Sequence, residues 1–268
     1  MNWISYESAA FTIAFVVSCL LLAVVEGVRP ARALTQSAES RWIAHGLLFA
    51  GGAVFQAALI RASPLLVAAM VAGASWGWLN RPWLPFALRF AGAILLLDLV
   101  HYATHRLFHA FGWLWRIHEV HHSDEDYDVT TSVRFHPLEV AGGKVLYLAA
   151  IALIAPPLAA VFVAEVHTTL LNSLVHANVS FPPAVERLVR LIFITPDLHR
   201  LHHSLDVVEQ NRNFGQTFVW WDWMFGTYCA LPRASAEEFS TGVAGLPPGS
   251  YEGVTKLFTE PFRSRRLG

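Results

Sequence analysis

The sequence is poor in charged residues and almost free of cysteine. Charged side chains make up 15% of its 268 residues, against about 25% in typical soluble domains. This deficit indicates a chain that lies largely in lipid. The net charge of −1 gives no electrostatic reason to expect nucleic acid as a partner. The two cysteines, Cys19 and Cys229, lie far apart, which argues against a disulfide framework, a cysteine zinc site and a built-in iron–sulfur cluster.

Long apolar runs replace the missing charge. Ser8–Val25 carries no charge and is long enough to cross a bilayer core. It has no obvious small-residue cleavage signal, so we interpret it as a retained anchor. Further apolar runs cover Ile43–Ile60, Leu65–Leu79, Leu84–Leu97 and Val145–Val163. Pro156 and Pro157 interrupt the last run, where they predict a kink or the turn of a helical hairpin.

The arginines predict the orientation. Arg29, Arg32 and Arg41 follow the first run, and more Arg and Lys residues accompany the histidines further on. Because such residues favour the cytoplasmic side, both regions should lie there, which requires an even number of crossings between residues 42 and 104. Three apolar runs compete for those crossings, so one should be partial or interfacial. We expect an all-α, multi-pass helical bundle with a cytoplasmic-side histidine-rich helical cap, in a bacterial cytoplasmic membrane.

Histidine is abundant and concentrated. Twelve of the 13 histidines lie between His101 and His203. In DLVHYATHRLFH, His105 and His109 are four residues apart and share one face of a helix, so they can bind one metal. Asp98 and Tyr102 continue this stripe as candidate catalytic positions. We expect Asp98 to orient a ligand histidine by accepting its second ring N–H rather than to bind metal itself.

Two further clusters repeat one pattern. HEVHHS holds His118, His121 and His122, and HRLHHS holds His199, His202 and His203. Neighbouring histidines in each can point to two different metals. His176 is a better ligand candidate than His167, nine residues earlier, because about 13 Å separates them on a helix. The roles of His101, His136 and His167 stay open, with His136 favoured as a non-ligand near the site.

The ligand count predicts a dinuclear centre. Eight or nine histidines are too many for one ion and fit two ions with about four to five ligands each. Imidazole suits iron, zinc or copper, but a structural zinc site would favour cysteine and would be closed by four ligands. A histidine site at a bilayer surface fits an acyl chain or a sterol as substrate. Breaking an unactivated C–H bond there requires an activated iron–oxygen oxidant.

The motifs together resemble the fatty acid hydroxylase / sterol desaturase superfamily. The matching patterns span Asp98–His109, His118–Ser123, Arg134–Glu139, His176–Asn178 and Pro196–Ser204, followed by NRNFG (Asn211–Gly215) and WDWMFGTY (Trp221–Tyr228). The resemblance implies two iron ions, O2 as co-substrate, and hydroxylation or desaturation of a lipid. It implies the metal ligands His105, His109, His118, His121, His122, His176, His199, His202 and His203. No other cofactor-binding residue is expected.

The resemblance also divides the chain. We expect an N-terminal transmembrane region at 1–83, a fatty acid hydroxylase-like di-iron domain at 84–231 and a polar C-terminal tail at 232–268. Since the sequence has no electron-carrier domain, electrons should come from a separate ferredoxin or cytochrome b5-like partner. The alternative outside enzymes is a non-catalytic membrane metal-binding or transport protein. Transport sites lie near the bilayer midplane, whereas these clusters lie in Arg-bearing stretches at the ends of spans, which disfavours that alternative.

Overall fold

The structure, a computed structural model, describes residues 3–235 and 238–263. This part of the chain is helical, with isolated bridges at Phe193–Phe218 and Ser204–Thr241 in place of strands, which confirms the all-α prediction. The α-helices are α1 (Trp3–Val28), α2 (Ala38–Leu59), α3 (Pro64–Val71), α4 (Phe86–Ala110), α5 (Gly112–His122), α6 (Pro137–Ile154), α7 (Leu158–Val175), α8 (Pro183–Val189), α9 (Pro196–His202), α10 (Val207–Gln210), α11 (Trp220–Met224) and α12 (Val254–Thr259). Two 3-10 helices are η1 (Val129–Val133) and η2 (Glu260–Phe262).

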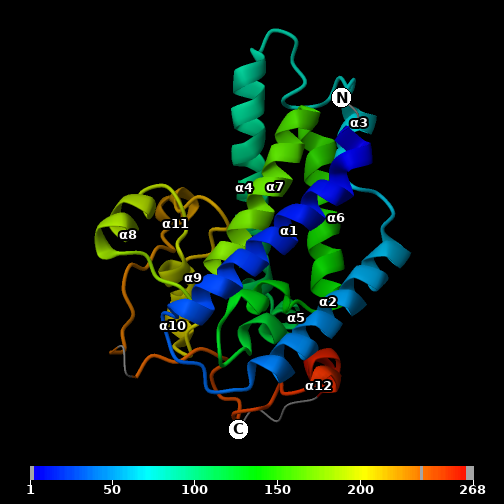
Figure 1. Cartoon of the computed structure of the whole chain (residues 1–268). Coiled ribbons are helices and arrows are strands. Elements are labelled where there is room, and N and C mark those ends of the chain that lie inside the picture. The colour runs from blue at the N-terminus through cyan, green and yellow to red at the C-terminus, as the bar shows by residue number, and fades with distance from the viewer. Residues whose placement is uncertain (1–2, 236–237, 264–268) are drawn as a thin grey trace.

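The long helices form an elongated bundle (Figure 1). Many large apolar side chains on these helices are exposed. Five segments are long and apolar enough to cross a membrane: Tyr6–Val28, Ala38–Val71, Phe86–Ala110, Pro137–Ile154 and Leu158–Val175. On α1, Ile13, Leu20 and Leu21 are each more than 60% exposed, which is costly in water and favourable in lipid. These features confirm the expected multi-pass membrane protein.

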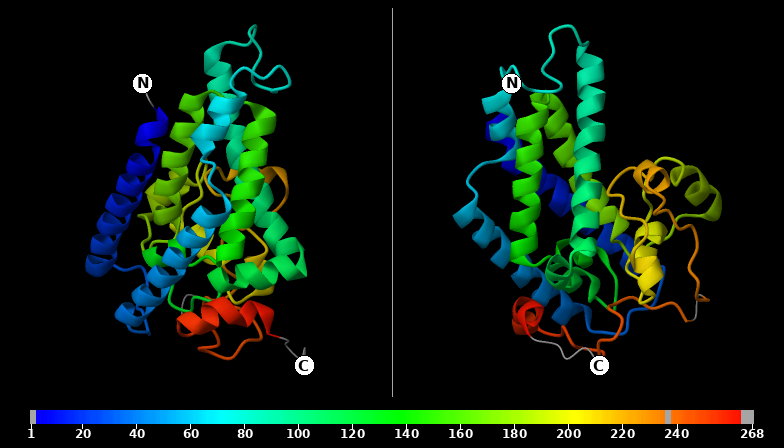
Figure 2. Two further views of the ribbon diagram at one scale, coloured as in Figure 1. Left: turned by 90° about the vertical axis from the view of Figure 1, so that its right-hand side faces the viewer. Right: turned by 180° about the vertical axis from the view of Figure 1, so that it is seen from behind.

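The second span is broken. The expected run Leu65–Leu79 is helical only over α3, and α2 ends at Leu59. Figure 2 shows α3 continuing upward from α2 across a short non-helical link, and together they form one candidate span. This pair and α4 are the two candidate spans that begin between residues 42 and 104 or shortly before, an even number as the arginine distribution predicts.

The proline pair turns a helical hairpin. Helix α6 ends at Ala155, whose φ of 47° lies in the left-handed region, and α7 begins directly after Pro157. The two helices pack against α3 and α4 through a core that includes Leu65, Leu97, Ile151 and Val161. The hairpin therefore carries the chain up from the histidine-rich end and back to it.

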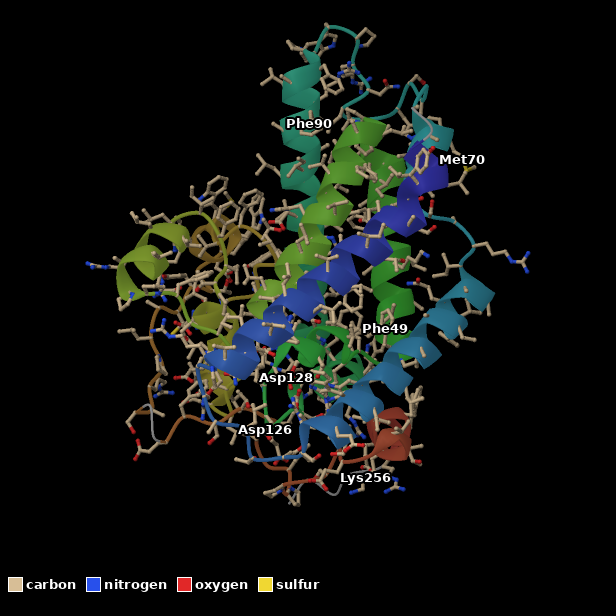
Figure 3. All side chains as sticks on the ribbon, in the orientation of Figure 1. Phe49, Met70, Phe90, Asp126, Asp128 and Lys256 are labelled. Carbon is tan, nitrogen blue, oxygen red and sulfur yellow. The ribbon has the colours of Figure 1, made fainter. Side chains whose placement is uncertain are left out.

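The short helices gather at one end of the bundle. Figure 1 places α5, α9 and α10 at the lower end, beside the loop after α1 and the start of α2. In Figure 3, Phe49, Met70 and Phe90 lie along the bundle, while Asp126, Asp128 and Lys256 lie at its lower end. The histidine-rich cap and the arginines after the first span therefore share one end of the molecule.

A buried ion network holds this end together. Arg41 donates to both carboxylate oxygens of Asp124, at 3.0 and 2.8 Å, and to Asp128 at 2.6 Å. All three side chains are at most 4% exposed. The network joins the start of α2 to the segment between α5 and η1.

The polar C-terminal segment is partly buried instead of lying on the surface as a tail. Tyr251 and Leu257 pack with Leu48 of α2 and Val120 of α5. The Tyr251 hydroxyl donates to Glu119 at 2.6 Å. This segment therefore closes the lower end of the bundle beneath the histidines.

Candidate metal centre

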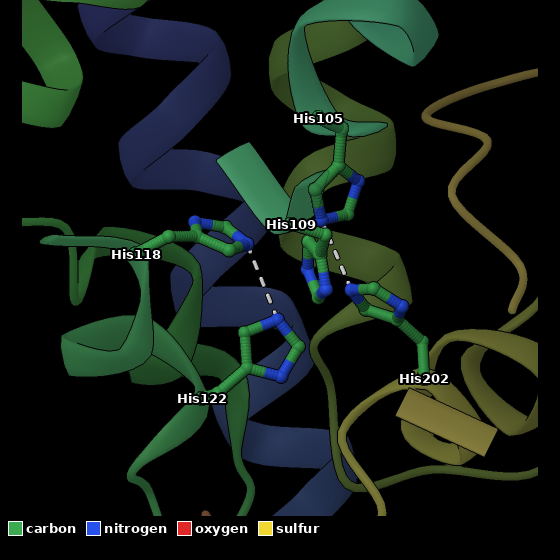
Figure 4. A group of neighbouring side chains, drawn as sticks. All are labelled: His105, His109, His118, His122 and His202. Carbon is green, nitrogen blue, oxygen red and sulfur yellow. Dashed lines mark hydrogen bonds between the residues drawn. The ribbon is translucent and has the colours of Figure 1, made fainter. Parts of the chain in front are cut away.

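Nine histidines converge in two adjacent groups. The first holds His105, His109, His118, His122 and His202, and the second His121, His176, His199 and His203. In each group one ligand atom per residue lies within 4.8 Å of all the others. Figure 4 shows the first group, in which rings from α4, α5 and α9 face a common centre. The two groups contain the same nine residues that the sequence motifs indicate.

The ring nitrogens have the spacing of metal ligands. Their Nε2 atoms are separated by 2.9 Å in His105 and His202, by 3.1 Å in His121 and His176, and by 3.0 Å in His176 and His199. With metal–nitrogen bonds of about 2.1 Å, neighbouring ligand atoms lie about 3.0–3.4 Å apart around one ion. The donor set therefore fits two first-row transition metal ions.

Adjacent histidines are divided between the two groups. His121 and His122 are consecutive, yet one belongs to each group, and His202 and His203 divide in the same way. On a helix, successive side chains differ by about 100° in direction. The HxxHH pattern therefore contributes to two centres from one turn of helix.

Hydrogen bonds to Nδ1 fix the orientation of four rings. The Nδ1 atoms of His105, His176 and His202 lie 3.0, 2.7 and 2.7 Å from backbone carbonyls of Phe214, Asn172 and Arg212. The Nδ1 atom of His118 lies 2.5 Å from a carboxylate oxygen of Glu139. Because Nδ1 donates its N–H to these acceptors, each Nε2 carries a lone pair that faces its group and can bind metal.

The segment that supplies two of these carbonyls is itself fixed. Asp222 is fully buried and accepts from the backbone N–H groups of Phe214 and Gly215, at 2.8 and 2.9 Å. Asn213 has a φ of 52° and its amide group donates to the carbonyls of Leu198 and Cys229. NRNFG therefore supplies the carbonyls that orient His105 and His202, and Asp222 of WDWMFGTY holds this segment in place.

Burial keeps the imidazoles neutral. It lowers the pKa of His118 to about 3 and that of His176 to about 4. Burial also lowers the pKa of His121, His199 and His203 well below its usual value. Because a metal binds the neutral imidazole, these side chains are ready to act as ligands at neutral pH.

A large cavity leads to the histidines. It has a volume of about 890 Å³ and is lined by His105 and His118 of the first group and His121, His176 and His199 of the second. Its walls come from α1, α4, α6, α7 and the link between α2 and α3, with side chains such as Phe11, Leu66, Phe108 and Phe135. This volume is typical of a small-molecule site and can admit a long apolar chain.

Asp98 and Tyr102 contact other residues than expected. Asp98 accepts from the Trp221 indole and the Phe218 backbone N–H, at 2.8 and 3.2 Å. The Tyr102 hydroxyl lies 2.9 Å from Thr227. Within the described residues neither side chain hydrogen-bonds a histidine, and neither lines the cavity. Asp98 therefore holds the segment after NRNFG and does not make the expected direct contact with a ligand histidine. Participation of Asp98 or Tyr102 in the reaction stays a prediction.

The remaining histidines lie outside both groups. His101 lines the cavity and stacks on Tyr147, with ring centroids 4.7 Å apart. His136 caps α6 by accepting from the Leu138 backbone N–H at 3.2 Å. His167 lies against Phe193 and Phe218. His136 therefore caps a helix and lies outside both histidine groups.

Glu139 is the functional residue that the sequence analysis passed over. It follows His136 and Pro137 in RFHPLE and faces His118 from the first turn of α6. The sequence does offer one indication of this role, because Glu139 is the carboxylate of a motif that matches the fatty acid hydroxylase / sterol desaturase superfamily. Its partner is 21 residues away on another helix, so helical spacing could not identify the pair.

The comparisons with known proteins agree with this geometry. The family model described as "Fatty acid hydroxylase" matches residues 90–227. The ornithine lipid hydroxylase OlsE of Rhizobium tropici is 30% identical over 96% of this chain and 78% of its own length. An alkylglycerol monooxygenase of Caenorhabditis elegans is 29% identical over 58% of this chain and 29% of its own. Methylsterol monooxygenase 2-2 of Arabidopsis thaliana is 31% identical over 50% of this chain and 49% of its own.

The chain thus spans most of one such relative and half or less of the other two. No solved structure matches it. The match to the family model covers the helices that carry all nine clustered histidines, and the relatives are lipid hydroxylases and monooxygenases. The chain therefore belongs to the fatty acid hydroxylase family and is a membrane oxidoreductase of the lipid-hydroxylating type.

Proposed function

We propose that the protein is a di-iron, O2-dependent hydroxylase of a polar membrane lipid. The observation that carries the proposal is the convergence of nine histidines in two groups at the end of an apolar cavity. The five-histidine and four-histidine groups would each hold one iron ion. Bound iron would supply the oxidising power that an unactivated C–H bond requires and that no side chain provides.

The chain itself positions the reactants. Apolar walls of the cavity bind the hydrocarbon part of the lipid and exclude water. The five histidines that line its inner end come from both groups, so a carbon placed there lies beside both groups. Glu139 and the carbonyls of Arg212 and Phe214 hold the ligand rings in place before substrate arrives. Hydroxylation and desaturation share these requirements and differ in how the carbon is placed.

The proposed substrate is an amino-acid-containing lipid such as ornithine lipid. The support is the relative that acts on ornithine lipid, because its similarity extends over 96% of this chain. Electrons would come from a separate ferredoxin or cytochrome b5-like protein. The cap would face the cytoplasm, since the arginine-bearing loop after α1 and the start of α2 contact it, through Arg32 with Asn178 and Arg41 with Asp128.

Metal content and product formation test the proposal. Protein purified without air or chelator should contain close to two iron ions per chain. Cells that express it should gain a lipid heavier by one oxygen atom, which becomes heavier still when oxygen-18 gas is supplied. A clean value of one metal per chain would refute the dinuclear centre, and an unlabelled oxygen in the product would refute O2 as its source.

His203 offers a variant that tests ligation with little effect on the fold. Both of its ring nitrogens are buried without a hydrogen-bond partner among the described residues. His203→Ala should therefore lower the metal content to about one per chain, abolish product formation and leave the thermal unfolding of the metal-free protein nearly unchanged. His136→Ala, which removes the cap of α6, is the matched control and should keep both metals.

A further inference from the structure

The cavity contains a charged pair away from the histidines. Lys144 of α6 and Glu165 of α7 both line it and attract one another electrostatically. No ion pair within 4.0 Å joins them in the part of the chain that the structure describes. Both are half-buried, and both lie within candidate membrane spans. Charges at such depth are costly and mark a site of function by default.

Glu7 and Tyr147 are further polar side chains of the cavity near the pair. Glu7 also faces the cavity, but it accepts from the Ser63 hydroxyl and the Leu65 backbone N–H at the start of α3. The Tyr147 hydroxyl lies beside Glu165 and is buried without a hydrogen bond of good geometry among the described residues. Lys144, Glu165 and Tyr147 therefore offer one cation, one anion and one hydroxyl to a ligand.

The position of the pair defines its distance from the metal centre. Lys144 is five residues beyond Glu139, which contacts His118, and this corresponds to about 8 Å along the helix. Glu165 is 11 residues before His176, or about 16 Å along α7. The charged pair thus lies one to three helical turns above the histidines, within the same cavity.

The break between α2 and α3 supplies a route for a polar group. Arg61 and Ser63 of this link line the cavity, together with Pro64 at the start of α3. Non-helical backbone at membrane depth is tolerated where it borders a cavity that holds polar groups or water. A lipid could therefore pass its polar end through this side of the bundle without crossing a purely apolar wall.

We propose that Lys144 and Glu165 form a subsite for a zwitterionic substrate group, with Glu165 binding an amine and Lys144 binding a carboxylate or phosphate. The inference rests on the proposed lipid hydroxylase function and specifies its substrate class. The subsite selects lipids that carry both charges. It places the reacting carbon of such a lipid one to three helical turns away from the charged groups. Neutral glycerol ethers and sterols lack these groups and gain nothing from the pair.

Binding to the purified, metal-loaded protein in lipid nanodiscs tests the subsite without turnover. The probes are Nα-dodecanoyl-lysine, which is zwitterionic, and 1-O-dodecylglycerol, which is neutral. The wild type should bind the zwitterion at least ~10-fold more tightly than the neutral probe. Glu165→Gln and, separately, Lys144→Met should each reduce that preference by about 10-fold while leaving the affinity for the neutral probe within about twofold. Glu165→Asp, which keeps the charge, should retain most of the preference.

Glu39→Gln, which removes an exposed carboxylate outside the cavity, is the control and should bind both probes like the wild type. Equal binding of the two probes by the wild type, or a preference that survives both single substitutions, would overturn the subsite. That result could coexist with normal hydroxylation of another lipid. Conversely, absence of any oxygen-labelled product would refute the proposed reaction and leave a measured binding preference intact.

Discussion

The contact between Glu139 and His118 predicts a selective loss of metal affinity. Glu139 is 8% exposed, and one of its oxygens lies 2.5 Å from Nδ1 of His118. The carboxylate fixes the tautomer and increases the basicity of Nε2. Glu139→Gln keeps an acceptor of similar shape but removes the charge. We therefore expect the metal held by the five-histidine group to bind about 10–100-fold more weakly, a loss of about 1.4–2.7 kcal/mol.

A cobalt titration can measure this effect. Cobalt(II) absorbs visible light when it is bound by imidazole, so competition with a chelator gives an affinity for each of the two sites. In Glu139→Gln one affinity should fall and the other should stay close to the wild-type value, because the four-histidine group has no contact with Glu139 that the structure describes. His118→Ala should lose the affected site altogether.

Glu119 provides the matched control. It is also a buried carboxylate on the cap, 1% exposed, but it accepts from the Tyr251 hydroxyl of the C-terminal segment. Glu119→Gln should lower stability without changing either cobalt affinity. The reasoning fails if Glu139→Gln binds both metals like the wild type. Complete loss of one metal, as in His118→Ala, would instead make Glu139 a ligand.

Three other outcomes are expected. Gly215→Ala places a Cβ 2.8 Å from an Ile194 carbon and 2.9 Å from a carboxylate oxygen of Asp222. Because the segment that orients two histidines must then shift, metal affinity should fall by about 10-fold. Unchanged affinity would contradict this. Ser37→Cys and Ser75→Cys expose thiols at opposite ends of the bundle; an impermeant reagent outside intact cells should label only the second, and labelling of the first would reverse the orientation. Arg41→Met leaves its buried aspartate partners without their cation, so we expect the free energy of unfolding to fall by about 3–5 kcal/mol. This loss is measured as a lower unfolding temperature in detergent. An unchanged temperature would show that the network contributes little.

The clustering of the histidines in HEVHHS and HRLHHS was predictable because their spacing is local. Spacings of three and four residues place His118, His121 and His122 on neighbouring faces of one helix whatever surrounds it. The apolar runs were predictable for the same reason, since length and hydrophobicity alone define a candidate span. Charge counting predicted an even number of crossings with one partial run, but it could not identify α2 and α3 as the broken span.

The partners of the ligands were not predictable in this way. Asp98 lies on the stripe of His105, and spacing alone suggested that it would contact a histidine. In the folded chain it instead reaches Trp221, 123 residues later, and the Nδ1 atom of His105 faces a backbone carbonyl 109 residues away. Helical spacing gives the face of a side chain, whereas its acceptor depends on which segment packs against that face. A backbone carbonyl also leaves no residue-type signal in the sequence.

The geometry of the site links metal binding to folding. Both ring nitrogens of His203 and Nε2 of His109 are buried without a hydrogen-bond partner among the described residues. Each buried polar atom of this kind costs free energy in the protein alone. Metal ligation satisfies the nitrogens that face the centres, and ions that bind only the folded protein stabilise it by mass action. The helices of the cap are short, five to eleven residues in α5, α9 and α11, and contribute little stability of their own. The least stable part of the chain is therefore the cap, where bound metal ions would cross-link α4, α5, α9 and the end of α7.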